Sequence, residues 1–144
     1  MKKQLIVSLV LFIGFVSITQ LQAQVNPSIK KLEQYFNNQQ LLITYRQGEV
    51  VYGTYYFLEV HYCPNGYYGL YGRSVKETVL GNEQRSNWRE YGTWQITSQG
   101  GVNGISYKPM NGVPKFVPLY TDRNGGLFIS SDISIQKKGR AICR

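Results

Sequence analysis

Three residues with metal-binding or catalytic side chains alternate within the segment that runs from Gly53 to Cys63. They are Glu59, His61 and Cys63, and the β-branched and aromatic residues around them predict a strand. Because residues two apart on a strand point to the same face, we expect all three to share one face. Each is a metal-ligand type, and a Cys–His pair is the centre of many thiol nucleophiles. The spacing therefore raises two chemical hypotheses, a metal site and an activated cysteine.

Both hypotheses lack supporting residues elsewhere in the chain. His61 is the only histidine, and the second cysteine, Cys143, stands almost at the C-terminus. A nucleophile also needs a hydrogen-bonded base and a third orienting group, whereas side chains that stand parallel on a strand rarely meet. The structural alternative is that His61 packs or faces solvent while Cys63 is disulfide-bonded. We expect no metal, no cofactor and no catalytic set, since paired carboxylates, a Ser/His/Asp set and a phosphate loop are also missing.

The two cysteines predict either one disulfide or two free thiols. An even cysteine count in an exported chain is consistent with a Cys63–Cys143 bridge. Such a bridge would close a loop of about 80 residues and, in the chain-entropy model, stabilise by roughly 4 kcal/mol. We expect the bridge, with two unpaired thiols as the alternative.

The N-terminus has the pattern of a secretory signal. Lys2 and Lys3 form a basic start, Leu5 to Ile18 is almost wholly apolar, and small Ala23 suits the position before a cleavage site. The apolar run has about 14 residues, fewer than the roughly 20 of a spanning helix, which argues against a retained anchor. We therefore expect a signal peptide over residues 1–23, cleavage before Gln24, and a secreted or periplasmic protein that is one domain from residue 24 to 144.

The charge of the chain is basic, with a formal value of +8 that becomes +6 once Lys2 and Lys3 are removed. Positive residues are scattered except in a basic C-terminal tail, residues 137–144, which holds Lys137, Lys138, Arg140 and Arg144. A basic exported protein could contact an anionic envelope surface, although solubility explains the same charge. The aromatic residues do not interleave with the basic ones along the sequence, so we expect no nucleic-acid partner.

The mature chain begins with one short amphipathic helix near residues 27–38. Asn26 is a good N-cap and Pro27 suits the first helical position. Ile29, Leu32 and Phe36 then recur at helical spacing between charged and polar residues. This is the one helix that the sequence predicts.

The rest of the chain predicts about eight short antiparallel strands separated by turn residues, the pattern of a barrel or a sandwich. Gly81 to Glu90 is polar and is interpreted as a loop that carries Trp88 beside arginines. The strand signals fall in ten short segments, of which 75–80 continues the strand at 67–71: residues 41–46, 50–52, 53–63, 67–71, 75–80, 92–96, 105–108, 116–121, 127–130 and 133–136.

The order of these signals resembles the lipocalin-like domains of small exported bacterial proteins. The matching elements are the Gly53-Thr54-Tyr55 start, the Asn65-Gly66 hairpin turn after Cys63, the strand Gly92-Thr93-Trp94-Gln95-Ile96, and the closing Gly126 to Ile129. The N-terminal helix departs from the pattern, and the start is Gly-x-Tyr where Gly-x-Trp is common. The resemblance implies a small up-and-down β-barrel with a cup for a small apolar ligand; it implies no single chemistry.

Two classes of function follow from this interpretation. The first is a lipocalin-like binding protein for a small hydrophobic or amphipathic ligand. The second is a protein-interaction module, such as an inhibitor, an immunity-type protein or an envelope component, which would act through loops and the basic tail. An enzyme has the least support, and we expect a monomer. Inward-facing aromatic and aliphatic residues are both the predicted core and the predicted ligand lining, and Trp88 is a candidate lid: Tyr56, Leu58, Tyr62, Trp88, Trp94 and Tyr107.

Overall fold

The structure is a computed structural model that describes residues 25–49 and 52–144. The predicted signal peptide, the cleavage position at Ala23 and most of the predicted strand at 50–52 lie outside the described residues. Within them, no helix is long and apolar enough to cross a membrane.

In the described part of the chain, helix α2 (Ile29–Phe36) precedes the strands and confirms the predicted element in a shorter form. Its N-cap is Ser28, whose hydroxyl oxygen accepts from the Lys31 backbone N–H at 3.2 Å. The prediction that Asn26 is the N-cap of this helix is therefore wrong. The side chain of an N-cap residue accepts from an N–H that the helix itself leaves free. Ser28, whose own carbonyl oxygen accepts the first helical bond from the Leu32 N–H, occupies this position two residues after Asn26.

Asn26 has a different structural role, because its side chain imitates a backbone strand partner. Its Nδ2 donates to the carbonyl oxygens of Asn103 and Leu119, both at 2.9 Å, and its Oδ1 accepts from the Asn103 N–H at 2.9 Å. These three bonds fasten the chain before α2 to the sheet.

The strands form two antiparallel sheets, which confirms the all-β, up-and-down prediction. The main sheet has seven strands in the order β6-β5-β4-β3-β2-β1-β9, so its first six strands are consecutive neighbours. A small second sheet pairs β7 with β8. The strands are β1 (Gln39–Gln47), β2 (Thr54–Tyr62), β3 (Tyr67–Glu77), β4 (Glu83–Gln99), β5 (Val102–Pro109), β6 (Lys115–Pro118), β7 (Tyr120–Thr121), β8 (Leu127–Phe128) and β9 (Ile133–Arg140).

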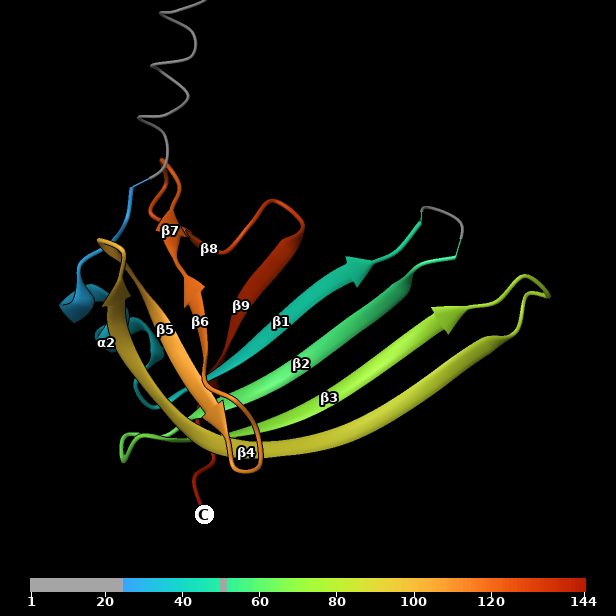
Figure 1. The fold of residues 1–144 in the computed structure, drawn as a ribbon, viewed down its shortest axis with the longest axis horizontal. Coiled ribbons are helices and arrows are strands. Elements are labelled where there is room, and N and C mark those ends of the chain that lie inside the picture. The colour runs from blue at the N-terminus through green and yellow to red at the C-terminus, as the bar shows by residue number, and fades with distance from the viewer. Residues whose placement is uncertain (1–24, 50–51) are drawn as a thin grey trace, which may run out of the picture.

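The main sheet curls into a half-barrel, with β6 and β9 as its two edges (Figure 1). The bend lies in β4, where Gly92 is buried. A Cβ at Gly92 would collide with the carbonyl oxygen of Lys108 and crowd the Tyr68 ring, so the close approach of β5 to the bent strand requires glycine. Beyond this bend, β1–β4 extend away from the helix as an open four-stranded wing (Figure 1).

The hydrophobic core lies between α2 and one face of the sheet, which we call the inner face. Leu32 and Phe36 of the helix pack with Leu41, Val60 and other buried residues, and the full buried cluster also contains Tyr62, Tyr68, Ile105 and Leu119. The opposite face of the sheet is called the outer face. Since side chains alternate along each strand, the core side chains assign every other residue of β1–β5 to the inner face.

Two sequence-based boundaries are wrong. Residues 83–90 are not a loop, because they form the first half of β4 and pair with β3 from Glu77↔Glu83 onward. Lys137, Lys138 and Arg140 do not lie in a tail, because β9 continues to Arg140 along β1. Residues 83–87 and 136–140 are exposed on both faces of their strands, so the alternation of buried apolar and exposed polar residues that indicates a strand is missing there.

Candidate functional site

The structure places all six predicted ligand-binding residues on the inner face, but it divides them into two groups. Tyr62, Trp94 and Tyr107 belong to or pack against the core beneath α2. Tyr56 and Trp88 lie on the wing, and Leu58 lies between the two groups.

The first group fills space. The Tyr62 ring centroid lies 5.0 Å from that of Phe36 and 5.4 Å from that of Trp94, both edge to face. The Trp94 Nε1–H donates to the carbonyl oxygen of Cys63 at 3.0 Å. Burial raises the pKa of the Tyr62 phenol, which keeps the hydroxyl neutral. The helix end of the half-barrel is therefore filled by protein side chains.

Tyr107 lies beside a buried polar pair at the edge of this core. The Tyr68 hydroxyl donates to a carboxylate oxygen of Glu90 at 2.6 Å, and the Tyr68 and Tyr107 rings meet edge to face at 6.1 Å. Burial, and then the hydrogen bond to the Glu90 carboxylate, raise the pKa of Tyr68. Tyr68 acts as a hydrogen-bond donor here and is not available as a base.

The second group forms an aromatic shelf, which we define as Tyr45, Tyr56 and Trp88. The Tyr45 and Tyr56 rings are stacked at 4.7 Å with only 10° between their planes, and the Trp88 ring meets Tyr56 edge to face at 6.4 Å. All three side chains are half-buried. The sequence interpretation placed Trp88 in a loop as a candidate lid, and this is wrong because Trp88 lies in strand β4. Its ring lies against Gly72 on β3, where any Cβ would collide with it.

An open hollow of about 360 Å³ lies at the neighbouring end of β1, β2 and β9. Tyr45 and Tyr56 belong to its lining, but Thr44, Arg46, Tyr55 and Phe57 on the outer face line it as well, so it does not extend the shelf on the inner face. The shelf is the part of the predicted ligand lining that lies away from the core beneath α2.

The outer face carries Glu59, His61 and Cys63 side by side, as the period-two pattern predicts. Cys63 is bonded to Cys143, which confirms the disulfide. The bridge holds the last residues of the chain over His61, whose side chain is almost fully buried. A disulfide fits an extracytoplasmic protein.

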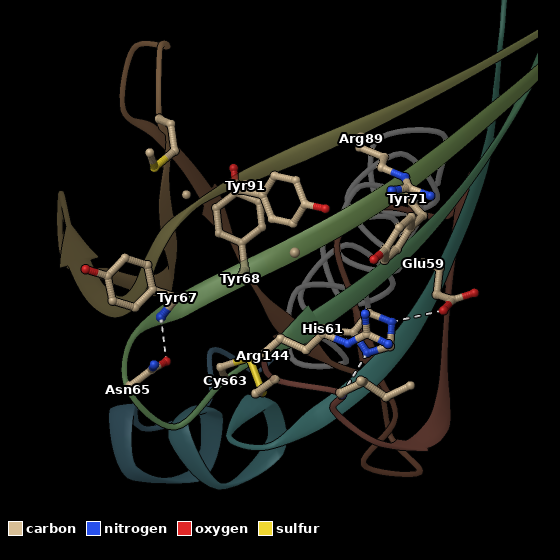
Figure 2. A pocket seen from close by; sticks show the side chains of 15 residues that line it. Glu59, His61, Cys63, Asn65, Tyr67, Tyr68, Tyr71, Arg89, Tyr91 and Arg144 are labelled. Carbon is tan, nitrogen blue, oxygen red and sulfur yellow. Dashed lines mark hydrogen bonds and ion pairs between the residues drawn. A yellow bond between two sulfur atoms is a disulfide. The ribbon is translucent and has the colours of Figure 1, made fainter.

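The hydrogen bonds of His61 define its tautomer. The Ile142 backbone N–H donates to Nδ1 at 3.1 Å, so Nδ1 carries the lone pair. Nε2 therefore carries the proton and donates to Glu59 Oε1 at 2.9 Å (Figure 2). Both ring nitrogens are occupied by structural bonds. Within residues 25–49 and 52–144, no group of three or more His, Cys, Asp or Glu side chains could hold a metal ion.

A groove of about 980 Å³ runs along the outer face beside this buried histidine. Tyr67, Tyr71 and Tyr91 line it and are between 41% and 55% exposed. Arg89 and Arg144 also line it, and Arg89 stands beside Tyr71 (Figure 2). The sequence analysis did not identify this outer groove. A signal was present, because Tyr67 and Tyr71 on β3 are separated by an even number of residues, as are Arg89 and Tyr91 on β4, so each pair shares one face of its strand.

Basic and aromatic residues do interleave on the outer face, although they do not do so along the sequence. Three arginines lie over the ring of the residue directly opposite on the neighbouring strand. The distances from guanidinium carbon to ring centroid are 5.2 Å for Arg46–Tyr55, 4.7 Å for Arg73–Phe57 and 5.1 Å for Arg89–Tyr71. Residues distant in sequence become partners through strand register, so the chain order hides the interleaving.

Comparisons with known proteins give no further guide to this site: no protein-family model, curated protein or solved structure matches the chain. The resemblance to lipocalin-like domains therefore remains a prediction.

Proposed function

We propose that this protein is an extracytoplasmic binding protein that holds a small apolar or amphipathic ligand on the aromatic shelf. One observation carries the proposal: a stacked tyrosine pair and a tryptophan stay half-buried on the inner face, beyond the part that α2 covers. Aromatic rings with polar tips offer a large apolar surface together with hydrogen-bonding hydroxyl groups.

The ligand on the shelf would be small. The helix end of the half-barrel is filled by Phe36, Tyr62 and Trp94, so it does not supply a deep cup. Leu58, which packs against the core from the side of the shelf, would form the floor between the filled end and the open end.

A protein-interaction role is the second candidate, and the open sheet favours it. The edge strands β6 and β9 each have one paired neighbour in the main sheet, and an unpaired strand edge can accept a strand of another chain. Such a partner would add backbone hydrogen bonds and would leave the shelf unoccupied.

The test uses the mature chain from Gln24, produced in an oxidising compartment. Its native mass is compared with its mass after denaturation without reduction. A discrete small-molecule increment in the native mass supports the shelf proposal. If the native mass shows no increment, the protein is titrated with an uncharged naphthylamine probe while the fluorescence of its two tryptophans, Trp88 and Trp94, is recorded. The proposal expects saturable binding that is lost in Tyr56→Ala and retained in Tyr91→Ala, a matched change on the outer face. No saturable binding, or equal binding by both variants, would exclude the shelf as the site.

A further inference from the structure

The outer face of the wing carries two exposed arginines that each lie over an aromatic ring. Arg73 lies over Phe57 and Arg89 lies over Tyr71, and we call Arg73 and Arg89 the arginine row. Neither arginine forms an ion pair or a side-chain hydrogen bond with the described part of the chain. By contrast, Arg85 on the same face is paired with Glu83 at 2.8 Å.

The geometry of the arginine row suits an anionic group. A guanidinium that is stacked on a ring keeps its N–H edges free, and these edges match the oxygens of a carboxylate, sulfate or phosphate. The ring beneath holds the plane in place, so less side-chain freedom is lost on binding. Arg73 and Arg89 lie on adjacent strands in diagonal register, which places their Cβ atoms roughly 7–8 Å apart. We propose that the arginine row and the outer groove bind an acidic polysaccharide.

The outer groove supplies the sugar-binding part of this site. Tyr67 and Tyr91 are 55% and 51% exposed, and no cation covers either ring among the described residues. Exposed aromatic rings with hydroxyl groups can stack on the apolar face of a sugar ring and bond its hydroxyls. Tyr71 and Arg89 also line a second surface pocket of about 580 Å³, which contains Arg73. The two hollows share Glu59, Tyr71 and Arg89 as lining residues, so they lie next to each other on the outer face.

Two other anionic partners fit this surface less well. The free rings of Tyr67 and Tyr91 could stack on a nucleobase as well as on a sugar, but the disulfide fits an extracytoplasmic protein, a location in which acidic polysaccharides are more common partners than single-stranded nucleic acids. A flat bilayer surface could reach the exposed arginines but would not fill the outer groove that the tyrosines line. A flexible chain of sugar rings can lie in the groove and place acidic groups on the arginine row.

The test measures binding by isothermal titration calorimetry at fixed ionic strength with the mature, oxidised chain. The acidic probes are polygalacturonate, which carries carboxylates, and heparin, which carries sulfates. Dextran, a 20-residue oligothymidylate and phosphatidylglycerol vesicles are the neutral, nucleic-acid and lipid comparisons. We expect saturable binding of at least one acidic polysaccharide, which identifies the preferred anion, and weaker binding of all three comparisons.

Three double variants locate the site. Arg73→Gln with Arg89→Gln should raise the dissociation constant roughly tenfold or more, because charge-assisted hydrogen bonds are lost. Lys30→Gln with Arg123→Gln removes the same charge from exposed positions elsewhere and should leave the constant within about twofold. Arg73→Lys with Arg89→Lys keeps the charge but loses the planar stacking, and it should weaken binding several-fold.

The outcomes divide clearly. No binding of either acidic polysaccharide, or tighter binding of the oligothymidylate or the vesicles, would overturn the proposal. Equal losses in the two glutamine doubles, or full affinity in the lysine double, would show that net charge alone attracts the polymer and would also overturn it. Urea unfolding of each variant confirms that the fold is intact, and Tyr56→Ala on the opposite face should bind the polysaccharide normally.

Discussion

Removal of the Cys63–Cys143 bridge should lower stability by a large and calculable amount. The two cysteines are 80 residues apart in sequence, and the chain-entropy relation for a loop of this length gives about 4.5 kcal/mol at 25 °C. The native state itself should lose little, since Cys143 is the second-last residue and the residues after β9 make few bonds: the Ala141 N–H donates to the Asn38 carbonyl oxygen and the Ile142 N–H donates to His61 Nδ1. Nearly all of the effect should therefore come from the greater freedom of the unfolded chain.

The assay is equilibrium urea unfolding of the oxidised protein and of a Cys63→Ala, Cys143→Ala double variant. With a urea slope near 2 kcal/mol per molar, the midpoint should fall by about 2 M. Wild-type protein in reductant should show a similar shift, which separates the effect of the bond from that of the alanines. In the variant, the Ile142 amide should also exchange with solvent almost as fast as in an unfolded peptide.

The reasoning would be refuted by a loss below about 2 kcal/mol with an unchanged urea slope. That result would mean that the unfolded chain is already compact between the two cysteines, or that the bridge strains the folded state. A reduced wild type much more stable than the alanine variant would instead assign the loss to the side-chain replacements.

Three further predictions follow from the core and the shelf. Leu119→Ala should cost about 2–5 kcal/mol in urea unfolding, because Leu119 is fully buried, whereas Leu80→Ala at an 87% exposed position should stay within about 0.5 kcal/mol. Gly72→Ala should displace the Trp88 ring and change the tryptophan emission and near-ultraviolet circular dichroism; spectra like those of the wild type would contradict the close Gly72–Trp88 contact. Because the pKa values of Tyr62 and Tyr68 are raised, their phenols stay protonated in the folded state while the unfolded chain releases its protons above pH 10. Their contribution is therefore complete below pH 10 and is lost as pH rises further, by roughly 1.4 kcal/mol per pH unit for each tyrosine, and Tyr62→Phe should make the midpoint less sensitive to pH between 10 and 11.5.

The sequence predicted those parts of the fold in which burial leaves a pattern. Alternation along Tyr56, Leu58, Val60 and Tyr62 placed these side chains on one face, and the structure packs Val60 and Tyr62 into the core. The helix was predicted because Leu32 and Phe36 recur on its buried side. In each case one face meets the core and the other meets solvent, so the residue types alternate with the period of the element.

The parts that were not predicted depend on contacts between distant segments. The first half of β4 looked like a loop because its residues from Glu83 to Asn87 are all exposed, and its order comes from pairing with β3. Asn26 was predicted to be a helix cap because it directly precedes Pro27 and the helix. Its actual partners, Asn103 and Leu119, are 77 and 93 residues away in sequence, so a local pattern does not reveal them. The arginine–aromatic pairs could not be predicted from the sequence, because they depend on the register between neighbouring strands. A shift of that register by one residue would place the two side chains of each pair on opposite faces of the sheet.

The disulfide also determines how the molecule would respond to tension. β9 is an edge strand, and a pull on an edge strand from its free end would normally separate it from β1 one residue at a time. Here the load on the C-terminus passes through Cys143 to Cys63, which directly follows β2, a strand with neighbours on both sides. The 80-residue segment between the cysteines is thus shielded from the load, and roughly 270 Å of extended chain could not be drawn out while the bond is intact. A pull on the C-terminus therefore acts on the end of a strand that is paired on both sides, and β9 is protected from being separated from its free end.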